Sequence, residues 1–225
     1  MTNVKYASID CNEKFINIYT ETLVGNCCKD PLGYECFQAL DADLYSIGDA
    51  VLKALDKSRD LTLPEEDRRT CGEIRLRDGV AAADQWVYEK HPEWKLFDKD
   101  SEAMLEASER WWKEIEKIYK VRSKEATFKR MQKNMQNVAV RKDMNNIKFK
   151  SLIHDRYGGW GSTKDNPAIE FSIPSSSPVE VVGAAAKYAI GNCRGKGADL
   201  IREILFPNGQ PESFEDYLKE LGLSV

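Results

Sequence analysis

The sequence has few of the residues on which catalytic and metal sites usually depend. It contains only two histidines, His91 and His154, and its six cysteines include no C-x-x-C pair. Zinc and iron–sulfur sites need such pairs or clustered histidines, and nucleophilic catalysis needs a serine or cysteine near a histidine. We therefore expect free thiols, as in a reducing compartment, with no catalytic residue, no cofactor and no metal.

Long apolar runs are also missing. The longest, such as "VEVVGAAAKYAI", carry charges and fall well short of the roughly 20 residues that span a bilayer. The first residues, "MTNVKYASIDCNEKF", show no secretory signal. With 42% hydrophobic and 31% charged residues, the composition is that of an ordinary domain with a sizeable core. We expect one domain over 1–225, a cytoplasmic location and no membrane partner.

A phosphate-binding motif is absent as well, although "PSSSPVEVVGAAAKYAIGNCRG" at 174–195 is rich in serine and glycine. No G-x-x-x-x-G-K-[ST] run occurs, and the glycines of "GNCRGKG" follow the helical pattern instead of opening it. The segment predicts a capped helix, with Ser177 as N-cap, Pro178 at the first position and Glu180 completing a capping box.

The periodicity predicts strands and helices in blocks. Alternating "VKYASI", "FINIYTETLV" and "YECFQAL" predict an antiparallel meander, followed by a helix from Leu44. Over 60–99 the pattern predicts a loop in "LTLPEEDRR", a short strand or turn in "GEIRLR" and one helix in "GVAAADQWVYEK". Helices follow from Ser101 and Lys124, then strands in "NVAVRK", "NNIKFKSLIH" and "AIEFSIP", and two short C-terminal helices.

One strand-to-helix unit occurs twice. Residues 34–59 align with 169–194 without a gap at an offset of 135, so that Gly48 meets Gly183. The sequence thus predicts an α+β fold of two pseudo-repeated antiparallel sheet-plus-helix halves, 1–59 and 136–194, with a mostly helical insertion at 60–135 and a helical tail at 195–225. A glycine at the same point of both helices suggests that the backbone lies close to a sheet there.

Charge is unevenly distributed. Residues 113–150 contain 12 lysines and arginines against 4 acidic residues, so the rest of the chain carries a net charge of about −12. The basic stretch is typical of a solvated helical face, or of a single-stranded nucleic-acid-binding module. The acidic remainder suits a basic partner.

His154 lies in "HDRY", the only place where a histidine, an acid and a cation are adjacent. A hydrolase or nuclease could be centred on such a trio. A strand that ends in a turn explains the same residues without chemistry.

The segments "KEATFKRMQKN", "GGWGS" and "SIPSSSPVEVVGAAAKYAIGNC", in this order, resemble the immunity proteins of contact-dependent growth inhibition (CDI) systems. The first half agrees, because "DADLYSIGDAVLKALDKSR" is similar to the family's "S-D-x-E-L-G-x-A-V-L-K-A-L-x-x-S-R" segment. The resemblance covers about 34–59 and 110–194. Residues 60–109 are longer than the usual connection, the tail from Lys196 extends the chain, and Ser162 stands where the family favours glycine.

The resemblance implies a non-enzymatic inhibitor that binds a cognate toxin domain, often a nuclease, in the cytosol. Acidic side chains facing a basic substrate cleft would speed association, and aromatic anchors would supply affinity. Nucleic acid is then not an expected partner. Charge and aromaticity at expected loop positions suggest seven contact residues: Asp41, Asp43, Glu65, Glu66, Asp67, Tyr157 and Trp160.

Overall fold

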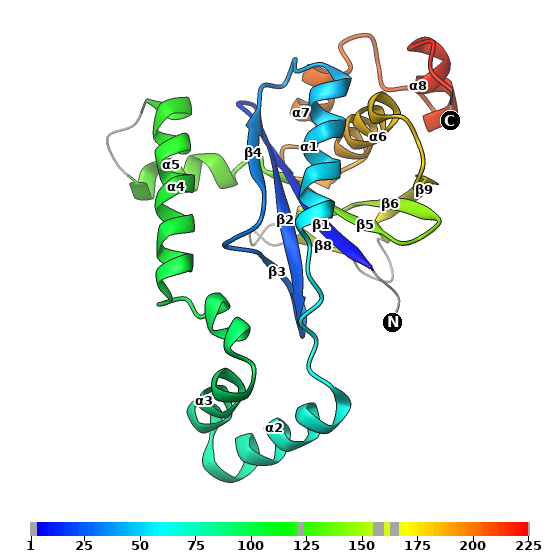
Figure 1. Ribbon diagram of the computed structural model, residues 1–225. Coiled ribbons are helices and arrows are strands. Elements are labelled where there is room, and N and C mark those ends of the chain that lie inside the picture. The colour runs from blue at the N-terminus through cyan, green and yellow to red at the C-terminus, as the bar shows by residue number, and fades with distance from the viewer. Residues whose placement is uncertain (1–3, 121–123, 155–159, 163–166, 225) are drawn as a thin grey trace.

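The computed structural model describes residues 4–120, 124–154, 160–162 and 167–224. Its centre is a seven-stranded, fully antiparallel sheet with two helices, α1 (Leu44–Lys57) and α6 (Val179–Gly191), packed on one face (Figure 1). The strands of the sheet are β1 (Lys5–Cys11), β2 (Ile16–Val24), β3 (Asn26–Lys29), β4 (Glu35–Gln38), β5 (Gln136–Lys142), β6 (Asn146–Ser151) and β9 (Ile169–Pro174).

The strand order confirms the predicted duplication. β4, β2 and β1 form one half and β5, β6 and β9 the other, in mirrored sequence across the sheet, and β1 pairs with β5 at the centre. Each half then continues into its own helix, α1 or α6. β1 and β5 are each seven residues long and antiparallel, and their register places Ser8 opposite Ala139, the middle residue of each strand. An approximate two-fold axis therefore passes through this pair.

The helix-covered face holds the main core. Alternate residues of the strands point to it, because side chains of a strand alternate between faces. The largest fully buried strand side chains of this core are Ile9, Ile16, Ile18, Ile147, Phe149 and Ile173. They pack against small residues of α6, which is buried along most of its length.

The paired glycines lie where α1 and α6 cross, not against a sheet as expected. A Cβ on Gly48 would stand 1.9 Å from the backbone oxygen of Val179, and a Cβ on Gly183 would stand 1.9 Å from that of Leu44. The two helices are equivalent in the repeat and cross at the approximate two-fold axis. Gly48 therefore faces the first turn of α6, and Gly183 faces the first turn of α1. Only a residue without a side chain permits this approach.

The two equivalent helices differ in how their N-termini are capped. Asp43 caps α1, and its carboxylate accepts a hydrogen bond from Ser46 N at 2.7 Å. In α6 the N-cap is Pro178. Among the described residues, no side chain caps the helix and the buried Ser177 hydroxyl has no hydrogen-bond partner. The predicted capping box is therefore wrong by one position. Pro178 aligns with Asp43 in the repeat, so the second copy has lost the capping side chain.

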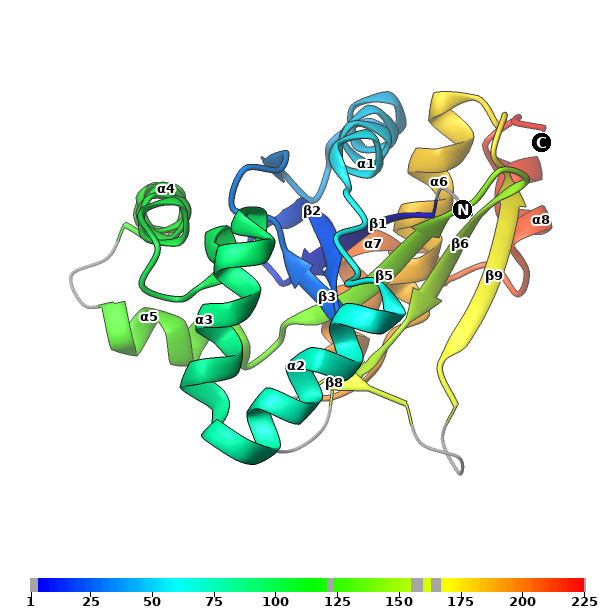
Figure 2. The same cartoon turned by 60° about the horizontal axis from the view of Figure 1, so that its bottom comes forward.

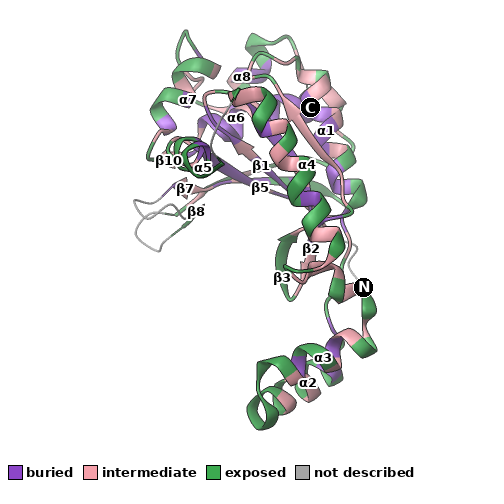
Figure 3. Ribbon diagram, turned by 90° about the vertical axis from the view of Figure 1, so that its left-hand side faces the viewer, coloured by how far each residue is buried: buried purple, intermediate pink, exposed green. Residues whose placement is uncertain are grey.

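The described residues of the insertion are mostly helical, with α2 (Glu65–Asp78), α3 (Val80–Lys90), a 3₁₀ turn η1 (Pro92–Phe97), α4 (Glu102–Tyr119) and α5 (Lys124–Gln132). The predicted loop is correct over 61–64, but α2 takes the place of the rest of that loop and of the predicted short strand or turn. α2 has acidic residues in its first turn and arginines in its last, so charge stabilises this helix more than an apolar face does. The N-cap of α4 is Ser101, as predicted. Figure 3 shows that α2 and α3 form a mostly exposed arm that extends from the body.

The remaining elements lie around this frame. A small second sheet joins β7 (Ile153–His154), β8 (Trp160–Gly161) and β10 (Arg194–Gly195). The tail forms α7 (Ala198–Leu205) and α8 (Phe214–Glu220), both packed on α6. Figure 2 shows α2 to α5 gathered toward the β3 end of the main sheet and α8 toward the β9 end.

Candidate functional site

The second face of the main sheet is apolar at β4, where Phe37 packs in a second hydrophobic cluster with residues of α4 and α5, and polar across the strands beyond it. Residues directly opposite in an antiparallel register share a face, and here one row runs Asn17, Asp10 and Asn137 across β2, β1 and β5. The next row contains Tyr19, Ser8 and Ala139. Toward β9 this face is exposed to solvent, with Arg141, Lys148 and Glu170 on it. We call this surface the open face.

Asp10 is the most perturbed group on the open face. Burial raises the pKa of its carboxyl to about 6, although hydrogen bonds from Asn137 and Tyr19 and the charge of Lys29 oppose the shift. Asn137 Nδ2 donates to Asp10 Oδ1 at 2.8 Å. No lysine or arginine forms an ion pair with Asp10 among the residues that the structure describes. Lys29, which is ion-paired with Glu35, therefore offsets the desolvation of the carboxylate only in part.

Glu21 lies on the same face in the same strand as Tyr19. Burial raises the pKa of the Glu21 carboxyl, the charge of Asp10 raises it further, and a hydrogen bond with Ser8 opposes both. The pKa of the Tyr19 hydroxyl is raised well above its usual value, mainly by burial. The open face therefore carries two carboxylates that are hydrogen-bonded to neutral groups only.

A groove of about 890 Å³ adjoins this network, between the β3–β4 segment and α4. Its walls include Lys29, Glu35, Phe37 and Trp111, and Glu35 also accepts a hydrogen bond from Asn17 Nδ2 at 2.9 Å. β4 pairs with β2 along one edge. The groove and the open face are therefore continuous through Glu35.

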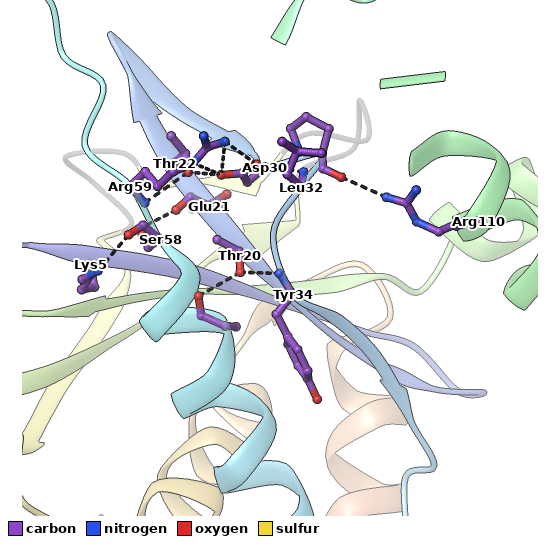
Figure 4. A network of polar contacts seen from close by, with 12 residues as sticks. Lys5, Thr20, Glu21, Thr22, Asp30, Leu32, Tyr34, Ser58, Arg59 and Arg110 are labelled. Carbon is purple, nitrogen blue, oxygen red and sulfur yellow. Dashed lines mark hydrogen bonds and ion pairs between the residues drawn. The ribbon is translucent and has the colours of Figure 1, made fainter. Parts of the chain in front are cut away.

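A buried ion pair fixes one wall of the groove (Figure 4). Asp30, whose side chain is 1% exposed, receives two hydrogen bonds from Arg59 at 2.8 and 2.9 Å and one from Thr22 at 2.6 Å. Arg110 of α4 donates to the Pro31 carbonyl at 2.9 Å. The loop after β3 is thus tied both to the end of α1 and to α4, which gives the groove a fixed shape.

The acidic residues predicted as contacts lie in two separate places. Asp41 and Asp43 precede α1 and are exposed, with Asp43 engaged in the helix cap. Glu65, Glu66 and Asp67 form the first turn of α2 in the arm, at the opposite end of the molecule (Figure 1). A single contact surface of ordinary size would have to span most of the molecule to include both groups.

Within the α2 group, only Glu65 and Glu66 face solvent. Asp67 is buried and binds both Lys90 Nζ at 2.6 Å and His91 Nε2 at 2.7 Å. These bonds lower the pKa of its carboxyl. His91 is the C-cap of α3, and its contact with Asp67 ties this helix to α2.

The aromatic candidates lie in the small second sheet. Trp160 is half-buried, donates from Nε1 to the Met135 carbonyl at 3.1 Å, and stacks on His154 with ring centroids 5.3 Å apart. Tyr157, like Asp155 and Arg156 of the "HDRY" string, lies outside the described residues. His154 is 3% exposed, with Nδ1 3.2 Å from the Lys196 carbonyl. Its described contacts are those of a packed structural residue.

The basic stretch does not form one patch. Its residues run from α4 through α5 to β6, and several pair locally: Lys113 with Glu109, Lys129 with Glu125, and both Lys148 and Lys150 with Glu170. All six cysteines are free, as predicted. Within the described part of the chain, no cluster of three metal-binding side chains occurs. No helix there is long and apolar enough to cross a membrane.

The family model of CdiI, the CDI immunity protein, matches residues 5–193. The chain belongs to the CDI immunity protein family. The match extends beyond the segments that carried the resemblance and spans both sheet-plus-helix halves and the helical arm. It ends before α7 and α8, in agreement with the expectation that the tail extends the family's core.

Relatives of this CdiI-family chain agree with the assignment. Immunity protein CdiI-YPIII of Yersinia pseudotuberculosis is 27% identical over 195 residues, which cover 84% of this chain and 96% of that protein. Among solved structures, the toxin–immunity complex CdiA-CT/CdiI from Yersinia pseudotuberculosis matches with a TM-score of 0.57 and 24% identity, covering 84% of this chain and 97% of the matched chain. A Neisseria meningitidis protein of unknown function matches at 0.59 and 22%, covering 85% and 96%. These structures share the fold.

The open-face residues were not predicted from the sequence. Asp10, Asn17 and Asn137 are single polar residues in otherwise apolar strands, and alternation alone assigns them to a solvated face. A signal was present, however. "ASIDC" and "NVAVR" pair at the centre of the sheet, where an acid or amide facing inward needs a partner.

Proposed function

We propose that this CDI immunity protein family member binds a cognate CDI toxin domain directly and neutralises it in the cytosol, without catalysis of its own. The observation that supports the proposal is the family match over residues 5–193. The described surface also offers a groove between the β3–β4 segment and α4 that a partner could occupy.

The test is co-expression with the C-terminal toxin domain encoded immediately upstream of this gene. The toxin alone should stop growth, and this protein should restore it and co-purify with the toxin in a 1:1 complex. A toxic domain that this protein neither rescues nor binds would contradict the proposal. A non-cognate immunity protein of the same family serves as control, because family members discriminate by their contact surfaces.

We further propose that the toxin is a nuclease and that the acidic residues contribute to binding. A cleft for nucleic acid is basic, so exposed acids such as Glu65 and Glu66 on the arm, and Asp41 and Asp43 before α1, would raise the association rate. Purified toxin should then degrade DNA or RNA, and one equivalent of this protein should stop it. Degradation by this protein alone that is lost in His154→Ala would instead support an enzyme.

Reversal of the charge at the two acidic sites separates their contributions. Glu65→Lys with Glu66→Lys, compared with Asp41→Lys with Asp43→Ala, tests which end of the molecule faces the toxin. The pair nearer to the toxin should slow association by about 10-fold at low salt, with a smaller effect at high salt. Equal rates for both pairs would remove these acids from the interface.

A further inference from the structure

The helix α2 buries little of its surface (Figure 3). Its only buried residue is the charged Asp67, whereas α3 buries the apolar Ala83 and Val87. Cys71 and Ile74 of α2 are half-buried. A helix of 14 residues is marginal in water unless an apolar face packs against another element. α2 therefore depends on a small number of contacts for its place in the arm.

The polar contacts of α2 with other elements are concentrated at Asp67. Its carboxylate accepts a hydrogen bond from Lys90 Nζ at 2.6 Å, and its second oxygen lies 2.7 Å from His91 Nε2. Lys90 is the last residue of α3 and His91 is its C-cap, so both bonds close the same end of the helix pair. Within the described part of the chain, the other side-chain hydrogen bonds and ion pairs of α2 stay inside the helix, such as Arg69 with Glu65.

The opposite end of the helix pair is a one-residue hinge. Gly79 alone separates α2 from α3, and its φ of +92° is one that favours glycine. Nothing in the described chain lies within 4 Å of a Cβ built on Gly79 or on Gly72, in the middle of α2. Glycine in a helix interior also lowers the stability of the helix. α2 can therefore turn or unwind at these two points without disturbing packed neighbours.

α3, by contrast, is tied to the body by a series of contacts that does not include α2. Tyr88 of α3 donates a hydrogen bond to the Asp98 carboxylate, at the end of η1, at 3.2 Å. Trp94 of η1 donates to the Leu61 carbonyl at 2.8 Å, and Leu61 N donates to the carbonyl of Leu23 in β2 at 2.9 Å. Loss of the contacts of Asp67 should therefore free α2 while α3 and η1 stay in place.

We infer that Asp67, Lys90 and His91 form a latch, and that α2 opens and closes on α3 as a unit of its own while the body stays folded. A segment with few buried apolar contacts opens at a lower free-energy cost than the core does. Glu65 and Glu66 lie beside Asp67 in the first turn of α2, so the latch also determines whether these two acids are held in one place. The inference concerns the free protein and does not depend on the proposed function.

The test is hydrogen–deuterium exchange of the full-length protein, resolved into peptides by mass spectrometry. In the wild type, the amides of α2 should exchange at least about 10-fold faster than those of β1 and β5. Asp67→Asn removes the charge that binds Lys90 and His91, so it should raise the rates in α2 by at least about 10-fold and those in β1 and β5 by less than about 2-fold. Glu66→Gln, a matched change at the exposed neighbour, should leave α2 within about 2-fold.

Lys90→Met decides the matter if Asp67→Asn does not fold, because the Lys90 side chain is 50% exposed and the change removes only one of the two bonds. It should raise the exchange rates in α2 by about 3-fold or more. Exchange of wild-type α2 at the slow rates of β1 and β5 would overturn the inference, because α2 would then open only with the body. Rates in α2 that neither variant changes, or rates that rise equally in α2, β1 and β5, would overturn the latch.

Discussion

The two faces of the central sheet are built from the same strands and are opposite in character. On the helix-covered face, alternate residues such as Ile9, Val138 and Phe149 are at most 1% exposed and fill the space under α1 and α6. On the open face, the intervening residues Ser8, Asp10 and Asn137 form a hydrogen-bonded polar network around the Asp10 carboxylate. Because side chains alternate between the faces, neighbouring residues of one strand lie in these two different environments.

The difference teaches where stability and recognition reside. A fold selected for stability alone would fill the central row of the open face with apolar or fully paired groups, because replacing buried polar groups by well-packed apolar ones is often neutral or stabilising. The helix-covered face does this and the open face does not. Because burial of polar groups on the open face lowers the stability of the free protein, we regard this face as the better candidate for partner binding.

The sharpest way to test the comparison uses neighbours on one strand. Phe149→Ala should lower the free energy of unfolding by about 3–5 kcal/mol, because Phe149 is fully buried and stacks on Phe171 at 5.5 Å. Lys150→Ala, on the opposite face, should change it by less than about 1 kcal/mol. Urea unfolding of both variants measures this. Equal losses would mean that the open face is as structural as the covered one.

The helix crossing gives the next largest effect. Gly183→Ala places a Cβ against backbone atoms of Leu44. Backbone atoms cannot rotate away as a flexible side chain can, so α1 and α6 must separate. We expect a loss of about 1–3 kcal/mol or more. Gly72→Ala is the matched control, since nothing lies within 4 Å of its Cβ in α2, and it should stabilise by about 0.5–1 kcal/mol. A tolerated Gly183→Ala would show that the helices are loosely packed.

The sequence predicts the elements of the helix-covered face better than it predicts the rest of the molecule. The helix-covered face is visible in the sequence as alternating apolar residues and a helical repeat. For this reason β1, β2, α1 and both sheet-plus-helix halves were predictable. The contacts between these elements were not predictable. The offset of 135 revealed that Gly48 and Gly183 are equivalent, but only the fold shows that each glycine contacts the helix of the other.

The errors arose where charge, not apolar periodicity, determines structure. α2 has a single buried residue, Asp67, so no apolar stripe identified it as a helix. Ser177 was chosen as a cap because its type and spacing were right, yet the helix starts one residue later. For the candidate site, a carboxylate such as Asp10 becomes unusual only through burial by segments distant in the sequence, such as the neighbouring strands β2 and β5, and such burial is not visible in a local pattern.

A third prediction concerns pH and the open face alone. The pKa of the Asp10 carboxyl is about 6 in the folded protein, against an ordinary value of 3.8. The charged form of Asp10 therefore destabilises the fold most above pH 6, and this penalty disappears as the pH falls below about 4. Asp10→Asn should thus raise the free energy of unfolding by about 1–3 kcal/mol at pH 7 and by nearly nothing at pH 4. Urea unfolding across this range measures the difference. A variant less stable than the wild type at pH 7 would show that Asp10 supports the fold.

The smallest expected effect lies in the arm, which belongs to neither face. Leu76 in α2 is 90% exposed, so Leu76→Ala should change the free energy of unfolding by less than about 0.5 kcal/mol. Thermal unfolding of the free protein and of its toxin complex measures the change in each state. A clear loss in the free protein would mean that the arm packs against the body in solution, whereas a loss confined to the complex would show that the arm contacts the toxin. The second result would extend the comparison to three regions, because an exposed apolar side chain of the arm would then take part in recognition.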